Sequence, residues 1–361
     1  MKFGLIYHLF FPEEALDGYG VDLREGDKVI PCGFCVADRK QIEDMVADKD
    51  IVTCDSIMSF ASKTGKSCSG KEWTIPLTPE MILRNQNPAV EMAAKACQQA
   101  KAWGADVAGL GLMLGKIGRR GQDVKAHVDI PVTNGDSYLI FHSAQVVKKL
   151  LDFFGWEPGT VKVAVYGFPS TIGTFLTEYL LSQGIEVILI ARQTSHVQKL
   201  IRKISDKYQT PVQLVSTFSE ALQEARIVFT AGSGAQMLNA DEMDKPVIVI
   251  DVSFPRNVFQ GSENMLVIDA NAIPLPRDLV NIDGYFPERI PTCLAELILL
   301  SFEEKKEGFS LGRNLSVEKI KEIGALAQKH GFAADLLYSF DKPLDVERLE
   351  YFKSLLAKKE I

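Results

Sequence analysis

The sequence predicts an α/β protein of two domains, with a Rossmann-type doubly wound parallel sheet in its C-terminal half and an N-terminal α/β substrate domain. The chain has 361 residues, which is too long for one ordinary domain. Its second half alternates short β-branched runs with helical patterns, which is typical of a parallel sheet covered by helices on both faces. A glycine-bearing loop directly follows the first strand of that half, as in dinucleotide-binding folds.

The composition agrees with a globular protein and disfavours several partners. Hydrophobic residues make up 46% of the chain and charged residues 24%, which is enough for a sizeable core. The net charge of −7 disfavours nucleic acid and anionic membranes. We expect no transmembrane segment and no signal peptide, because no apolar stretch has the required length and flanks. The six cysteines are scattered, which indicates reduced thiols and a cytoplasmic protein.

The first domain is expected to span residues 1–155. Residues 11–75 show no regular pattern and are expected to be irregular. Around them we expect a buried opening strand, a helix, a strand, a glycine-rich basic loop and a second helix, at 3–10, 87–104, 105–113, 115–125 and 138–156. Gly104 ends the first of these helices, and Asp136 or Ser137 can cap the second.

The stretch GWEPGT (155–160) is the best linker signal, and the Rossmann domain is expected to span residues 156–290. Its strands are expected at 161–167, 186–192, 212–217, 226–232, 246–252 and 265–270, with helices at 171–184 and 195–208. Residues 291–361 form a third segment. We expect it to hold two helices that pack back on the first domain, 292–307 and 316–331, and a tail after residue 335.

The loop GFPSTIG, between Gly167 and Gly173, is the candidate dinucleotide site. Its first glycine makes the tight turn and its last lets helix and strand pack closely, but Ser170 occupies the middle position where a third glycine is usual. The helix that follows attracts phosphate at its N-terminus. The alternative is a plain structural turn. The full cofactor site is assigned to Gly167, Phe168, Pro169, Ser170, Thr171, Ile172 and Gly173, with Ala231 and Gly232 at the end of a later strand.

The end of the second Rossmann strand favours NADPH as cofactor. NAD enzymes usually carry an acid there to hold the ribose hydroxyls, and this strand ends in Arg192 without one. An arginine can pair with a 2′-phosphate. The alternative is an ordinary surface arginine.

Two other patterns are weaker. SFASKTGKS (59–67) ends like a phosphate loop but lacks its first glycine and a following helix, so we reject nucleotide binding there. CGFC (32–35) lacks the second close cysteine pair that zinc sites usually show, so no metal is predicted, although a redox or metal site is the alternative to thiol packing.

Cys293 opens a strongly apolar helical run in PTCLAELILL and is either a core thiol or a nucleophile. If Thr292 caps the helix, the thiol lies at the positive end of the helix dipole, which lowers the pKa of a cysteine. Glu296 is expected to be an acid of the first turn that complements this dipole, although it could instead orient a partner.

Several short segments resemble the long-chain acyl-(acyl-carrier-protein) reductases best known from cyanobacteria. They are FGLI with His8-Leu9, Pro79-Glu80-Met81, TNGDS (133–137), GFPSTIG, LIAR (189–192), FPRN (254–257), CLAE (293–296), GRN (312–314) and KHGF (329–332). The resemblance covers most of residues 3–332 in order and spacing. Ser170 and Asp136 depart from the family pattern, and residues 11–75 diverge strongly.

The resemblance implies an NADPH-dependent reduction of a fatty acyl thioester to an aldehyde, with Cys293 as the catalytic nucleophile that forms an acyl-enzyme. Substrate binding is assigned to Thr133, Asn134, Gly135, Asp136 and Ser137. An acyl carrier protein is a further candidate partner. Because such carriers are acidic, docking would need a local basic patch. The best candidates for it are Lys116, Arg119, Arg120 and Lys125, and the alternative is that these residues form an ordinary solvated loop.

Two alternatives to this function stay open. Shikimate-type dehydrogenases share the architecture and act on a small hydroxy acid with NADP but without a covalent step. The altered glycine loop also permits a nucleotide-binding regulatory protein without turnover.

Overall fold

The structure is a computed structural model that describes residues 1–8, 47, 51–53, 57–231, 243, 245–253, 257–258, 261–276, 279–281, 289–312, 314–332, 336–340 and 342–358. It divides into two compact units, residues 1–139 with 272–333 and residues 140–271 with 334–361. The first division therefore falls inside a helix, α6 (Asp136–Phe154), rather than in the linker expected at 155–160. Gly155, with φ +72°, marks only the end of that helix.

The first unit is built on a mixed sheet with a parallel centre. Strand β1 (Lys2–His8) pairs in parallel with β4 (Ser67–Ile75) on one side and β5 (Val107–Leu110) on the other, and β6 (Val132–Thr133) continues beyond β5. Antiparallel pairing adds further strands to the β4 side, namely β2 (Val52–Thr53), β3 (Met58–Ala61) and β14 (Val280–Asn281). A separate two-stranded ribbon joins β13 (Ala272–Pro274) to β15 (Arg289–Pro291).

The expectation of irregular structure is wrong for residues 58–75. They form the hairpin of β3 and β4, and the phosphate-loop look-alike at 59–67 covers the end of β3, the turn and the first residue of β4, so a strand follows it where a phosphate loop has a helix. The sequence of β4 (SCSGKEWTI) does not look like a buried strand, because it contains polar residues although the sheet buries most of it. Even Glu72 is only 2% exposed.

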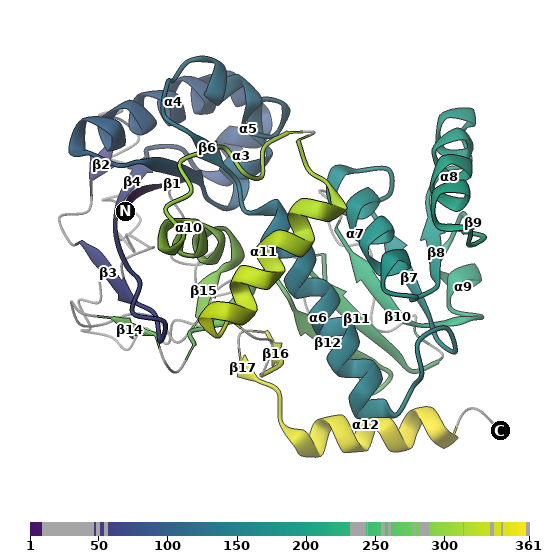
Figure 1. The fold of residues 1–361 in the computed structure, drawn as a ribbon. Helices are drawn as coiled ribbons and strands as arrows, with labels where there is room; N and C mark the ends of the chain where they lie inside the picture. The colour runs from purple at the N-terminus through teal and green to yellow at the C-terminus, as the bar shows by residue number, and fades with distance from the viewer. Residues whose placement is uncertain are drawn as a thin grey trace. The chain divides into compact units, whose positions relative to one another are not determined.

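Helices cover both faces of this sheet. A side-chain carbon at Gly4 would touch α4 (Gln86–Trp103) at Ala100, whereas one at Gly109 would touch α10 (Thr292–Phe302) at Leu297. Because Gly4 pairs with Ala108 across the strands, Gly4 and Gly109 belong to opposite faces. Figure 1 shows α4 and α10 on either side of the sheet. Within the described residues, the unit also contains the helices α3 (Pro79–Arg84), η1 (Leu112–Lys116), α5 (Ile117–Ala126) and α11 (Val317–His330).

Residues 115–125 were expected to be a loop and instead belong to η1 and α5. The glycines of this segment made the sequence look like a loop, because they lie at a break within the helix. The four residues from Gly118 to Gly121 all have positive φ, between +49° and +84°, and form a left-handed turn inside α5. A left-handed conformation is costly for Arg119 and Arg120, whose Cβ atoms crowd the backbone there.

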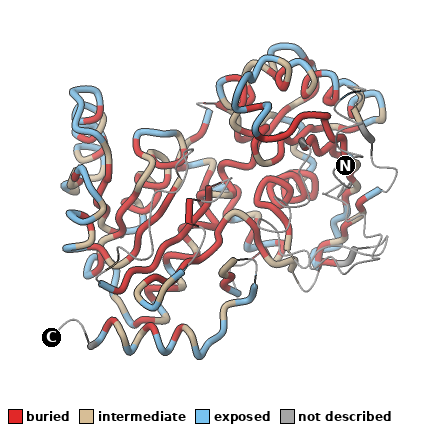
Figure 2. The backbone as a smooth tube through the Cα atoms, turned by 180° about the vertical axis from the view of Figure 1, so that it is seen from behind, coloured by how far each residue is buried: buried red, intermediate tan, exposed pale blue. Residues whose placement is uncertain are grey.

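The second unit confirms the predicted Rossmann sheet. Its strands all run parallel in the order β12, β11, β10, β7, β8, β9, which is the doubly wound order of dinucleotide-binding folds. The strands are β7 (Lys162–Tyr166), β8 (Val187–Ile190), β9 (Gln213–Val215), β10 (Ala225–Thr230), β11 (Val247–Asp251) and β12 (Met265–Asp269). Strands β8, β11 and β12 are buried along their whole length, and Figure 2 shows the buried strands of this unit in red, as expected for a parallel sheet.

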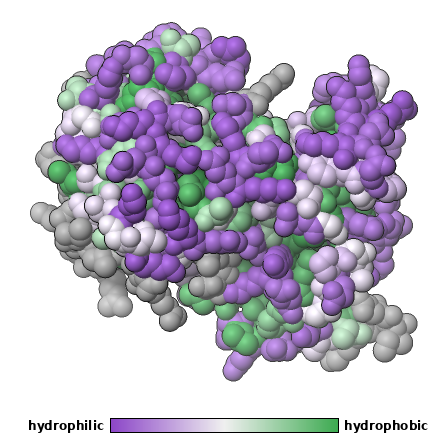
Figure 3. Space-filling model, in the orientation of Figure 1, coloured by the Kyte–Doolittle hydropathy of each residue, from purple (hydrophilic) through white to green (hydrophobic). Residues whose placement is uncertain are grey.

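Helix α8 (Ser195–Tyr208) spans the residues predicted for it. It buries Val197, Ile201 and Ile204 and turns its charged residues outward, so that Figure 3 shows a hydrophilic surface over it. The other elements of the unit are α7 (Thr171–Ser182), α9 (Phe218–Ala221), β16 (Tyr338–Ser339), β17 (Lys342–Pro343) and α12 (Val346–Lys358). Among the described residues, no helix has the length and hydropathy that a bilayer span requires.

Candidate active site

Cys293 lies where three parallel strands of the first unit end. It is the second residue of α10 and is 6% exposed. The hydroxyl of Tyr7, near the end of β1, lies 3.9 Å from its Sγ. Gly111 follows β5 and touches the Tyr7 ring so closely that a side-chain carbon would come within 1.8 Å of it. The carboxyl ends of parallel strands are where α/β proteins usually bind their ligands.

The third strand end brings Gly135 against Cys293. Gly135 follows β6 and has φ +83°, a left-handed conformation that favours glycine. A side-chain carbon there would lie 2.4 Å from Cα and 2.8 Å from Cβ of Cys293. Only glycine fits this position, and the TNGDS segment is thereby placed directly beside the thiol.

Two expectations about Cys293 itself are wrong. The helix begins one residue earlier than expected, with Pro291 at the cap position and no capping side chain, so Thr292 is not the cap. Burial raises the pKa of the Cys293 thiol rather than lowering it, because a thiolate loses its hydration there. The helix N-terminus opposes that effect but does not overcome it.

The thiol is nevertheless surrounded by hydrogen-bond donors, which lower its pKa in part. They are the backbone N–H groups of Leu112, Leu294 and Cys293 and the hydroxyl of Tyr7. Leu112 has φ +54°, a strained conformation for a leucine, and this turn directs its N–H at the sulfur. Neither Leu112 nor Tyr7 carries a local sequence signal for this role.

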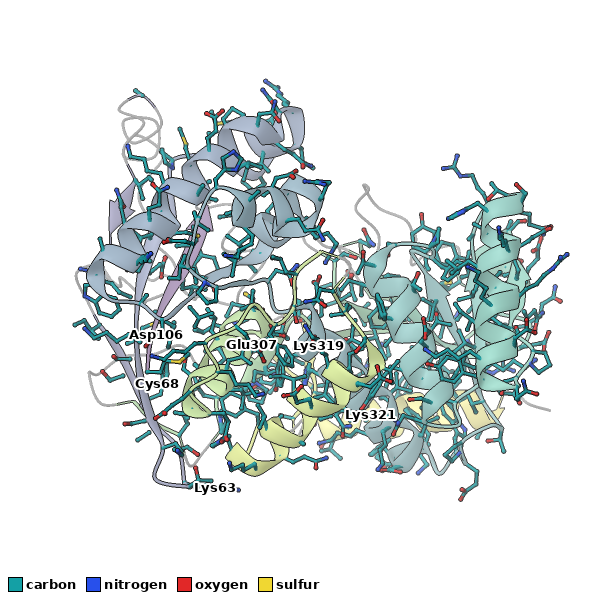
Figure 4. The ribbon with its side chains drawn as sticks, turned by 45° about the horizontal axis from the view of Figure 1, so that its top comes forward. Lys63, Cys68, Asp106, Glu307, Lys319 and Lys321 are labelled. Carbon is teal, nitrogen blue, oxygen red and sulfur yellow. The ribbon has the colours of Figure 1, made fainter. Side chains whose placement is uncertain are left out.

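The other described cysteines are ordinary core thiols. Cys68 on β4, labelled in Figure 4, and Cys97 on α4 are both buried, and burial raises the pKa of each to about 12. Cys32, Cys35 and Cys54, and with them the CGFC pattern, lie outside the described residues. Within the described chain, no group of three or more His, Cys, Asp or Glu residues is arranged to hold a metal.

Glu296, one turn after Cys293, is fully buried rather than a surface acid of the first turn. Its carboxylate accepts hydrogen bonds from the hydroxyls of Thr133 (2.5 Å) and Ser310 (2.9 Å) and from the backbone N–H of Tyr138 (3.0 Å). Burial raises the pKa of Glu296 to about 7, against the lowering effect of these three donors.

These bonds cap helix α6 from elsewhere in the chain. Asp136 and Ser137, expected as caps, are its first residues. Their N–H groups are bound by Asn134 Oδ1 (3.2 Å) and Ser310 Oγ (2.9 Å), and that of Tyr138 by Glu296. The free N–H groups of the first turn thus find side-chain acceptors. The hydroxyls of Thr133 and Ser137 are engaged in the same network.

Most of the residues expected to form a basic patch instead make contacts within the protein, so the expectation of an exposed basic patch is wrong. Arg120 donates to the Asp136 carboxylate through Nε (2.9 Å) with its side chain 22% exposed. Lys125 donates to two backbone carbonyls, and Lys116 is half-buried at the end of η1. Arg119 remains exposed but pairs with Asp123. The left-handed turn in α5 explains the arrangement, because it turns Arg120 inward while Arg119 stays outside.

The dinucleotide loop has the close approaches that its glycines predict. Gly167 has φ +108°, and a side-chain carbon there would come within 3.0 Å of the Ala231 carbonyl oxygen. At Gly173 it would come within 2.9 Å of the Gly167 backbone. Gly167 and Ala231 follow β7 and β10, the neighbouring strands at which the sheet order reverses. A dinucleotide binds at this point of a doubly wound sheet, and the glycine cradle fits one.

Ser170 fills the middle position of the loop as a helix cap. Its Oγ accepts the N–H of Gly173 (3.2 Å), and α7 begins at Thr171. Pro169 and Ser170 are exposed, whereas Phe168 and Ile172 are buried and pack the loop in place. Arg192 is exposed just beyond β8. Gly232, assigned to the same site, lies outside the described residues.

The chain is similar to several known proteins. Residues 160–274 match a family model described as shikimate/quinate 5-dehydrogenase. The chain is 26% identical over 359 residues to a long-chain acyl-(acyl-carrier-protein) reductase of Synechococcus elongatus, covering 91% of this chain and 98% of that protein. It is also 26% identical over 316 residues to the aminotransferase PigE of a Serratia species, covering 85% of this chain but only 37% of that protein's length.

Solved structures resemble the chain at a lower level. A shikimate dehydrogenase in complex with NADP+ is 13% identical, with a TM-score of 0.40, over 91% of this chain and 95% of that one. An NAD-dependent malic enzyme from Thermotoga maritima is 14% identical, with a TM-score of 0.41, over 79% and 73%. The family model and the reductase similarity support an NAD(P)-dependent oxidoreductase.

Proposed function

We propose that the protein reduces a fatty acyl thioester to an aldehyde with NADPH, through an acyl-enzyme on Cys293. The observation that carries this proposal is the thiol itself, buried among hydrogen-bond donors at the ends of three parallel strands. The similarity to an acyl-(acyl-carrier-protein) reductase, which spans nearly all of that protein, supports the same chemistry.

In the first step the Cys293 sulfur attacks the thioester carbonyl carbon. A new carbon–sulfur bond forms, the bond to the donor's sulfur breaks, and the proton lost by Cys293 leaves with the donor thiol. The N–H groups of Leu112, Cys293 and Leu294 can stabilise the negative charge that develops at this site. Their fixed orientation offsets part of the desolvation that holds the resting thiol protonated.

In the second step the acyl carbonyl is reduced and the aldehyde is released as Cys293 leaves as a thiolate. The nicotinamide supplies the hydride for this step. Gly167, Gly173 and Ala231 would hold its pyrophosphate side, and Arg192 would favour the 2′-phosphate of NADPH. The acyl donor is a coenzyme A or acyl-carrier-protein thioester.

Mass spectrometry after incubation with a long-chain acyl-CoA, without NADPH, tests the proposal. We expect one acyl group on Cys293 and its loss when NADPH is added. Cys293→Ser should lower aldehyde formation by several orders of magnitude, since a hydroxyl is a far weaker nucleophile than a thiol. Cys68→Ser is the matched control, because that buried thiol lies outside the donor cluster. Aldehyde at the parent rate from Cys293→Ser would exclude the covalent route through this thiol, and no acyl-enzyme and no aldehyde from the parent protein would favour a shikimate-type dehydrogenase.

A further inference from the structure

Three hydrogen bonds can all be donated to the Glu296 carboxylate. The Tyr138 N–H can only donate, and the hydroxyls of Thr133 and Ser310 both donate to the carboxylate. Ser310 Oγ meanwhile accepts from the N–H of Ser137, and it lies 2.7 Å from the Ser137 hydroxyl oxygen, a second acceptor for its proton. This pattern fits an ionised Glu296 at the positive end of α6, where a carboxylate is stabilised.

The same atoms also allow a second arrangement of hydrogen bonds. Thr133 Oγ1 lies 3.3 Å from the carbonyl oxygen of Ser310, which is an alternative acceptor for its proton. If Glu296 takes up a proton, it can donate to Thr133, and the Thr133 hydroxyl can turn to that carbonyl. Both patterns keep every group paired, so the network can exist with Glu296 charged or neutral.

We propose that Glu296 is a positioning residue for Cys293, which holds the Thr133–Ser137 loop against the thiol in an arrangement that depends on whether Glu296 is charged. The reason is connectivity. Glu296 shares α10 with Cys293, its partner Thr133 begins the loop, and Gly135 of that loop touches the Cys293 backbone. A change at Glu296 therefore reaches the thiol through packed backbone. This inference rests on the proposed function only in its consequence for acyl transfer.

The other ionisable groups around the network are accounted for. Asp136 is the charged neighbour that raises the pKa of Glu296 by repulsion, and it is itself paired with Arg120. Burial raises the pKa of Tyr138 and of Cys293, so both are neutral where Glu296 titrates. An inflection near neutral pH is therefore assigned to Glu296, and the Cys293 thiol gives a separate one at higher pH.

Glu296→Gln tests the proposal, because a glutamine reproduces the neutral pattern. Its amide oxygen can accept from Tyr138 and Ser310, and its NH2 group can donate to Thr133. The rate of Cys293 alkylation by iodoacetamide and the rate of acyl transfer are measured from about pH 5 to about pH 9. Within this range we expect one inflection in the parent protein, that of Glu296, and its loss in the variant, because burial raises the pKa of the Cys293 thiol above its ordinary value of 9.0. At about pH 8 the variant should be about 10-fold to 100-fold slower in acyl transfer.

Two further variants sharpen the test. Thr133→Val, which removes the shared hydroxyl, should also abolish this inflection, whereas Thr133→Ser should retain it. Ser301→Ala is the control, since Ser301 is buried on the same helix with no hydrogen-bond partner for its hydroxyl in the described structure.

The outcomes separate this inference from the proposed function. Altered alkylation profiles without any acyl transfer would support the positioning role and overturn the acyl-enzyme. Acyl transfer with the same pH profile in the parent and in Glu296→Gln would overturn the positioning role alone. If Cys293 resists alkylation, hydrogen exchange of the Tyr138 amide replaces that readout, and a pH dependence that is only the ordinary base catalysis of amide exchange, the same in the parent and in Glu296→Gln, would likewise overturn it.

Discussion

A side-chain carbon at Gly135 would lie 2.4 Å from the Cys293 α-carbon, so the two residues touch through their backbones. Flexible side chains can move out of the way of an added methyl group, but main chain at the start of a buried helix cannot. The segment TNGDS is thus fixed relative to the thiol by shape, and Glu296 fixes it a second time by hydrogen bonds. The polar side chains of this segment form hydrogen bonds within the protein, and these bonds hold the segment beside Cys293.

Gly135→Ala should disable the Cys293 site. The new methyl group would force the loop and α10 apart, and alanine is also strained at φ +83°. We expect a loss of about 2–4 kcal/mol in the free energy of unfolding, with acyl transfer nearly abolished. Gly65→Ala is the matched control. Gly65 has φ +79° but no atom within 4 Å of the added carbon, so it carries the strain without the clash.

Urea denaturation of the two variants measures the difference. Equal stability losses would mean that the loop moves freely and that the contact with Cys293 does not constrain it.

Arg120→Ala should destabilise the protein, and Arg119→Ala should not. Arg120 pairs with the buried Asp136 carboxylate through Nε and Nη2, and the carboxylate would lose both donors. Losing a hydrogen bond to a buried charged group costs about 1–3 kcal/mol. Arg119 pairs with Asp123 at a surface position with its side chain 71% exposed, where an ion pair contributes little. Thermal denaturation of both single variants tests this, and equal melting temperatures would show that the Arg120 pair is dispensable.

Glu296 should make the folded state less stable as pH rises through the range from about 4.5 to about 7. Folding raises the pKa of Glu296 from its ordinary value of 4.5 to about 7, so the folded state holds a proton that the unfolded state releases. Its contribution to stability is complete below the lower value and lost above the higher one. At about 1.4 kcal/mol per pKa unit the full effect amounts to about 3 kcal/mol.

The measurement is the free energy of unfolding in the parent protein and in Glu296→Gln across that range. The difference between the two should change with pH in this direction. A constant difference would mean that Glu296 keeps an ordinary pKa in spite of its burial.

The sequence allowed the Rossmann unit to be predicted nearly element by element, for a physical reason. Parallel strands buried on both faces are continuous runs such as VILI (187–190), and the helices between them have one apolar stripe, as in α8. Local patterns therefore carry the fold. In the first unit β4 contains SCSGK and α5 contains GRRG, and each violates its local pattern because tertiary contacts decide.

The candidate site divides in the same way. Cys293 and the glycines of the nucleotide loop could be found, since a cysteine at a helix start and a strand–glycine–helix order are local signals. The partners of the thiol could not. Tyr7, Leu112 and Gly135 come from three separate strand ends, and the cap of α6 is completed by Glu296 and Ser310, more than 150 residues away. Expecting a lowered pKa for Cys293 failed for the same reason, because burial is a property of the fold.

Arg192→Ala should weaken NADPH binding and leave NADH binding nearly unchanged. Arg192 is exposed beyond β8, where the second strand of a dinucleotide fold meets the adenosine ribose. A guanidinium there can form charge-assisted hydrogen bonds with the 2′-phosphate, which NADH lacks. Losing them should cost about 1–3 kcal/mol of NADPH binding free energy, which isothermal titration measures directly. Arg202→Ala provides the matched control, because Arg202 is an exposed arginine of α8 in the same unit. If Arg192→Ala weakens both cofactors equally, the side chain does not recognise the phosphate, and cofactor preference must come from another residue of the site.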